Sequence, residues 1–167
     1  MKERGIILNH ELAGMAYSGE LTQLRIVAQK TMKLKNPDVC DFYTDGIIDD
    51  RQNFFRYPYG GVGDRIWIRE SFRPDSMVYK ADGDRTAPRF GIGGWLNPGE
   101  MPRWASRTTM DIVEVRLQRL HDMSEADAAA MGSDVIEIMN LWDRTVPHIE
   151  HRYHTNPLTW VYDLEII

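Results

Sequence analysis

The chain has 167 residues, 43% of them hydrophobic and 27% charged, which is ordinary for a single folded domain. Its net charge of −5 argues against holding nucleic acid by overall charge, and no apolar run reaches the roughly 20 residues that cross a bilayer. The single cysteine, Cys40, excludes an intrachain disulfide and a multi-cysteine zinc site and favours a reducing cytoplasm.

Charge is distributed unevenly along the chain. Residues 56–107 carry nine basic side chains against six acidic ones, whereas residues 108–167 carry four against eleven. A local arginine-lined cleft is therefore compatible with the acidic total. The N-terminal MKERGIILNHEL has too short an apolar run for a signal peptide.

The N-terminal segments predict a strand, a helix and a second strand. The apolar run at 6–8 predicts a buried strand, and Asn9 is placed to cap a helix over 10–18 that ends at Gly19. Residues 22–28 alternate as a strand does.

Residues 30–58 mix five aspartates with aromatic side chains. The spacing and the closing glutamate of a calcium-binding loop are missing, so a solvated loop with an aromatic anchor is the better interpretation.

The stretch GGVGDRIWIRESF at 60–72 is the centre of the predicted fold. After a glycine turn the residues alternate, which places Ile66, Ile68 and Glu70 on the core face of a strand. A carboxylate on that face is either one half of a structural ion pair or a functional group that lines a pocket. The candidate partners for such an ion pair are Arg69, Arg103 and Arg107.

After this strand, residues 76–81 predict its hairpin partner, and residues 82–99, rich in glycine, predict a long surface loop. Residues 108–120 predict one long strand. Its apolar positions change parity near Ile112 and Val113, which predicts a β-bulge there.

The C-terminal part predicts two short helices and a closing strand. Ser124 with Asp127 forms the signature of a capped helix, and Ser133 is placed to cap a second helix. Residues 158–167 predict the last strand. Long β segments with few helical crossovers predict an α+β fold, a small mixed or antiparallel barrel with peripheral helices, in one domain over 1–167.

Four stretches together resemble the ASCH domains of the PUA-like superfamily, in the long form found in phage and prophage proteins. They are NHELAGMAYSGELTQLR at 9–25, PYGGVGDRIWIRESF at 58–72, MPRWASRTTMDIVEVRLQRLHDMSEADAAAMG at 101–132 and NPLTWVYDLEII at 156–167. The resemblance implies a pseudo-barrel with a cleft beside it, a cytoplasmic protein of a bacterial host, and RNA, nucleotides or modified nucleosides as partners. Small bacterial members remove acetyl from N4-acetylcytidine, and other members cleave RNA.

The residues that the amidohydrolase branch uses are not matched here. The branch's glycine matches Gly19, but its lysine falls at Leu21, its threonine at Leu24 and its glutamate at Met131. Amide hydrolysis needs an activated nucleophile, a proton donor and an oxyanion stabiliser, which leucine and methionine do not supply. The resemblance therefore implies a retained scaffold whose catalytic positions are lost.

Seven side chains remain as candidate ligand contacts: Thr22, Gln23, Arg25, Glu70, Arg103, Trp104 and Arg107. Trp104 is suited to stack on a base and the arginines to hold phosphate. The alternatives are that Trp104 packs in the core and that the arginines pair with acids. Glu70 is the remaining candidate for a general base.

Histidines recur at three-residue spacing in PHIEHRYH, at His148, His151 and His154. This spacing fits a metal-binding helix face, but the flanking prolines favour a solvated loop, so no metal and no cofactor are expected.

Three hypotheses follow from the sequence. The first is a binding module for a nucleotide or single-stranded RNA. The second is a divergent amidohydrolase or ribonuclease that uses Glu70. The third is a factor that binds a host protein through its acidic C-terminal third. None of them involves a membrane.

Overall fold

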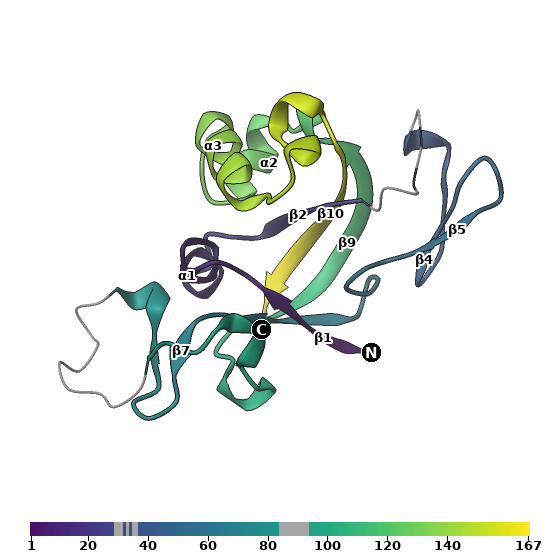
Figure 1. Ribbon diagram of the computed structural model, residues 1–167. Coiled ribbons are helices and arrows are strands. Elements are labelled where there is room, and N and C mark those ends of the chain that lie inside the picture. The colour runs from purple at the N-terminus through teal and green to yellow at the C-terminus, as the bar shows by residue number, and fades with distance from the viewer. Residues whose placement is uncertain (29–31, 33, 35–36, 84–93) are drawn as a thin grey trace.

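The computed structural model describes residues 1–28, 32, 34, 37–83 and 94–167. In these residues a five-stranded mixed sheet has the order β1-β6-β9-β10-β2 (Figure 1). β1 is parallel to β6, and the other neighbours are antiparallel. The strands are β1 (Glu3–Ile7), β6 (Arg65–Arg69), β9 (Thr109–Arg119), β10 (Leu158–Ile166) and β2 (Gln23–Val27).

Three α-helices accompany the sheet in the described residues, which confirms the predicted α+β class. They are α1 (His10–Ser18), α2 (Glu125–Ala130) and α3 (Val135–Thr145). Figure 1 shows α1 between β1 and β2 in the chain path, and α2 beside α3. Two smaller sheets contain β3 (Asp41–Phe42), β4 (Gly46–Ile48) and β5 (Phe54–Arg56), and β7 (Phe72–Arg73) and β8 (Val78–Tyr79).

The N-terminal helix has the predicted bounds and caps. The Asn9 side chain accepts a hydrogen bond from the backbone N–H of Leu12 at 2.9 Å, and Gly19 ends the helix with φ of 84°. The run at 6–8 is only partly buried, however. Because neighbouring residues of a strand face opposite sides, Ile6 lies in the core while Ile7 is exposed.

The predicted bulge in β9 is confirmed. Asp163 of β10 pairs with Glu114, but the next residue, Leu164, pairs with Ile112, which leaves Val113 as the extra residue. Val113 is exposed, whereas Val115 and Leu117, which follow the bulge, are buried.

The two C-terminal helices begin with side-chain caps. The Ser124 hydroxyl accepts from the Asp127 N–H at 3.1 Å, and the Asp127 carboxylate accepts from the Ser124 N–H at 2.9 Å. The predicted cap of the second helix is displaced by one residue, because Asp134, not Ser133, accepts from the Glu137 N–H at 2.9 Å.

The hairpin predicted at 76–81 is shorter than expected. Only Val78–Tyr79 pairs, with Phe72–Arg73, because a 3₁₀ turn at Lys80–Asp82 ends the strand. Most of the predicted loop at 82–99 lies outside the described residues, as do parts of 30–58. Helices long and apolar enough for a bilayer crossing are absent from the described ranges.

The predicted barrel does not close in the part of the chain that the structure describes. β1 and β2 are the two ends of the strand order, and no ladder joins them. The core side chains Ile6, Leu24 and Trp160 belong to one buried cluster behind this gap. The sheet is therefore an open, curved layer with two edges, and these edges position the site.

Candidate functional site

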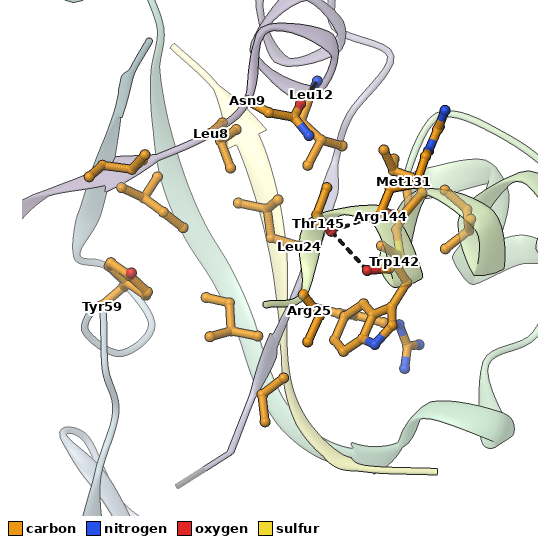
Figure 2. Close-up of a pocket in the computed structure, with 17 residues that line it drawn as sticks. Leu8, Asn9, Leu12, Leu24, Arg25, Tyr59, Met131, Trp142, Arg144 and Thr145 are labelled. Atoms are coloured by element: carbon orange, nitrogen blue, oxygen red, sulfur yellow. Dashed lines mark hydrogen bonds between the residues drawn. The ribbon is translucent and has the colours of Figure 1, made fainter. Parts of the chain in front are cut away.

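A cavity of about 540 Å³ opens between the two edge strands (Figure 2). One wall comes from Ile6–Leu8, and the opposite wall from residues 24–27. The helices α1 and α3 complete the lining, the latter through residues such as Trp142 and Thr145. The cavity thus occupies the place where a closed barrel would have joined its first and last strands.

The cavity walls are mostly hydrocarbon. Their polar residues are Asn9, Arg25, Tyr59, Arg144 and Thr145. The lining residues that the structure describes include no Asp, Glu, His, Cys, Ser or Lys. A concave apolar site with a few polar groups is typical of small-molecule binding, and it holds no group with the pKa of a general base at neutral pH.

Leu24 and Met131, two of the three positions that the ASCH resemblance would assign to catalysis, both line this cavity. Leu21, the third of these positions, is fully buried, and its N–H donates to the carbonyl of Met15.

Arg25 contributes to the lining, but its guanidinium is enclosed. Nε donates to Gln23 Oε1 at 3.1 Å and Nη2 to Gln118 Oε1 at 2.7 Å, and Nη2 lies 3.2 Å from Asp127 Oδ2. Burial lowers the pKa of Arg25, and Asp127 opposes this effect. Arg25 therefore holds β2 against the start of α2.

Asp127 is the centre of that partly buried network. Gln23 Nε2 donates to Asp127 Oδ1 at 2.9 Å and to Asp163 Oδ1 at 2.8 Å, and Arg116 Nη2 donates to Asp127 Oδ1 at 2.9 Å. Burial alone would raise the pKa of Asp127, but hydrogen bonds from Gln23 and Ser124 and the charge of Arg25 lower it to about 2.

The network also fixes one cavity wall indirectly. α2 and α3 share an apolar cluster in which Ala128 and Met131 pack with Ile138 and Leu141. Because Asp127 anchors α2 to the sheet, it also positions the α3 side chains that line the cavity. The sequence identified Asp127 only as a helix cap; its pairing with Gln23 needed the tertiary structure.

Of the two interpretations of Glu70 that the sequence allowed, the structure supports the structural ion pair. Its carboxylate accepts from Arg107 Nε at 2.9 Å and Nη2 at 3.1 Å, and Arg107 Nη1 donates to Asp82 at 2.7 Å. The rings of Tyr17 and Tyr79 each lie 4.1 Å from the guanidinium carbon. Burial alone would lower the pKa of Arg107, but the hydrogen bonds that it donates to Glu70 and Asp82 outweigh this effect and raise the pKa. All three nitrogens of Arg107 are thus engaged within the protein.

Arg103 and Trp104 lie on the surface. Arg103 Nε is 3.0 Å from Glu3 Oε2, and its guanidinium carbon lies 5.7 Å from the centre of the Trp67 ring. Trp104 is 71% exposed, so the alternative that it packs in the core is wrong.

The seven predicted ligand contacts do not gather in one place. Arg25 alone of them lines the cavity; the others are Thr22 and Gln23 beside α2, Glu70 with Arg107, and Arg103 with Trp104. The Thr22 hydroxyl donates to the carbonyl of Ala130. Sequence reasoning missed Tyr59 and Arg144, because the local sequence around them does not indicate that they lie near β1 and β2.

The histidine stretch has no helix longer than a 3₁₀ turn, at Ile149–His151 and Tyr153–Thr155. Over the described ranges, no three His, Cys, Asp or Glu side chains gather closely enough to hold a metal ion.

Comparisons with known proteins add little to this geometry. No family model matches the chain, and no curated protein matches it. Among solved structures it is similar to protein EF3133 from Enterococcus faecalis, described by family model DUF984. The two share 9% sequence identity with a TM-score of 0.49, over 100% of this chain and 81% of the other.

Proposed function

We propose that this chain is an ASCH-like binding module that accepts a nucleoside, a nucleotide or one base of a single-stranded RNA in the cavity between β1 and β2. The resemblance described from the sequence supplies the ligand class, and with it a bacterial, phage-related cytoplasmic setting. The cavity supplies a site of suitable chemistry: apolar walls for a planar ring, and polar groups for its edges.

One observation carries the proposal. Leu24 and Met131, which the sequence match assigned to lost catalytic groups, line the same cavity although they are far apart in the chain. A cavity with leucine and methionine at those positions can hold a base but cannot activate water. This combination favours binding over hydrolysis.

The enzyme hypothesis that uses Glu70 has less support. Glu70 does not belong to the cavity lining, and both of its oxygens accept hydrogen bonds from Arg107. A general base needs a free lone pair within reach of the substrate, so Glu70 is better explained as structural. For the third hypothesis, that the acidic C-terminal third binds a host protein, the described residues provide no supporting observation.

Isothermal titration calorimetry with cytidine, N4-acetylcytidine and cytidine monophosphate tests the proposal. Ile26 lines the cavity and is only half-buried, so Ile26→Trp should fill the cavity and abolish binding while thermal melting stays cooperative. Val113→Trp, at the exposed bulge, is the matched control and should bind as the wild type does. If the wild type binds none of these ligands at millimolar concentration, or if it deacetylates N4-acetylcytidine, the proposal is wrong.

A further inference from the structure

An exposed tryptophan, Trp104, lies in the 3₁₀ turn Arg103–Ala105, next to an arginine that contacts a second tryptophan on β6. Trp104 is 71% exposed, an unusual state for the largest apolar side chain. Its neighbour Arg103 lies 5.7 Å from the ring centre of Trp67, and Arg69 lies 5.4 Å from the same ring. We call Ile7, Trp67, Arg69, Arg103 and Trp104 the Trp104 surface.

Strand register explains why these side chains gather. Gly5 of β1 pairs with Trp67 of β6, and Ile7 pairs with Arg69, so all four lie on one side of the two strands. The opposite side carries Ile6, Ile66 and Ile68, which are buried. Gly5 leaves room for the Trp67 indole, because a Cβ at that position would lie 2.7 Å from Trp67 Cζ2.

The Trp104 surface is continuous with the cavity. Ile7 is 56% exposed and also lines the cavity. Its Cδ1 lies 3.9 Å from the position of a Cβ on Gly99, and the carbonyl of Gly99 accepts a hydrogen bond from Arg69. Ring contacts join Arg69 to Trp67 and Trp67 to Arg103, and Trp104 is the residue after Arg103 in the 3₁₀ turn Arg103–Ala105. A polymeric ligand with one unit in the cavity can extend along these side chains.

The chemistry of the path fits a single-stranded nucleic acid. An exposed indole stacks on any base, and guanidinium groups between aromatic side chains hold phosphates. Of the two arginines, Arg103 is balanced by Glu3, whereas Arg69 donates to a neutral carbonyl, so the surface keeps an excess of positive charge. This excess stands out in a chain whose net charge is −5.

We propose that the Trp104 surface binds the nucleotides that flank a base held in the cavity, so that the ligand is a single-stranded RNA segment. This inference rests on the proposed function, because it takes the cavity as the anchor for one base. It assigns Trp104 to base stacking and Arg103 and Arg69 to phosphate contacts.

Fluorescence anisotropy with a labelled single-stranded RNA of about ten nucleotides, beside calorimetry with cytidine, tests the inference. Trp104→Ala should weaken RNA binding about tenfold and leave cytidine binding unchanged, since one stacked base is lost. Arg103→Gln should weaken RNA binding and make it less salt-dependent, by about one unit in the slope of log affinity against log salt. Ile136→Ala is the matched control, because Ile136 on α3 is 68% exposed and does not line the cavity.

Each outcome is informative. If both surface variants bind RNA as tightly as the wild type, the Trp104 surface is not the RNA path, even where cytidine binding persists. If neither ligand binds the wild type, the proposed function fails and this inference fails with it. If RNA fails but a polyglutamate peptide binds and Trp104→Ala removes that binding, the surface recognises an acidic protein segment and the assignment to RNA is overturned.

Discussion

Glu70 and Arg107 form a two-point ion pair in which Nε meets Oε1 at 2.9 Å and Nη2 meets Oε2 at 3.1 Å. Both side chains are largely enclosed, with 1% and 13% of their surface exposed. The pair joins the end of β6 to the segment before β9, which are far apart in the sequence.

Removing the charge of Glu70 should therefore destabilise the fold rather than change a reaction. Glu70→Gln leaves Arg107 with Asp82 as its remaining acidic partner, and we expect a loss of about 2 kcal/mol in the free energy of unfolding. Urea denaturation measures this loss, and cytidine affinity should stay unchanged. Asp82→Asn is the comparison: because Asp82 is more exposed, its loss should cost less than half as much.

Asp127 makes stability depend on acid. Its pKa in the folded protein, about 2, lies below its ordinary value of 3.8, so the network contributes fully above about pH 4 and is lost as the pH falls towards about 2. We expect this difference in pKa to contribute about 2 kcal/mol to the free energy of unfolding. Urea denaturation of the wild type and Asp127→Asn across this interval should give curves that converge at low pH. A constant difference between them would show that Asp127 does not titrate in this way.

Arg144 is one of the residues that line the cavity, and its exposed side chain lies 3.7 Å from Glu11. Because Arg144 belongs to the cavity lining, we expect its guanidinium to pair with the phosphate of a bound nucleotide. Arg144→Gln should therefore weaken cytidine monophosphate binding about fivefold without changing cytidine binding. Arg56→Gln, a comparably exposed arginine outside the cavity, controls for net charge. Equal losses for both ligands would place Arg144 against the base instead.

Gly5 supports the Trp104 surface by leaving space. In Gly5→Ala the new Cβ would lie 2.7 Å from Trp67 Cζ2 and from Arg69 Cδ, so both side chains must shift, and we expect a loss of about 1–2 kcal/mol together with weaker RNA binding. Gly14→Ala in α1 is the control, because its Cβ would meet Ala81 at an ordinary 3.6 Å and alanine favours a helix. Thermal melting measures the loss of stability, and fluorescence anisotropy measures RNA binding. Unchanged RNA affinity in Gly5→Ala would show that Trp67 does not contribute to RNA binding.

Local features of this protein followed from the sequence alone. The caps at Asn9 and Ser124 and the bulge at Val113 were predictable, because each depends on side chains and backbone groups within a few residues or on the parity of one strand. The α+β class followed from the same strand and helix patterns.

Only the tertiary structure decided what these elements build together. Glu70 had three candidate arginines, and the choice of Arg107 depends on how distant segments pack. The same holds for the cavity: in the described residues no ladder joins β1 to β2, and Leu24 and Met131, separated by more than half of the chain, both line the space between them. Contacts between distant residues are set by the packing of the whole core, which no short stretch of sequence encodes.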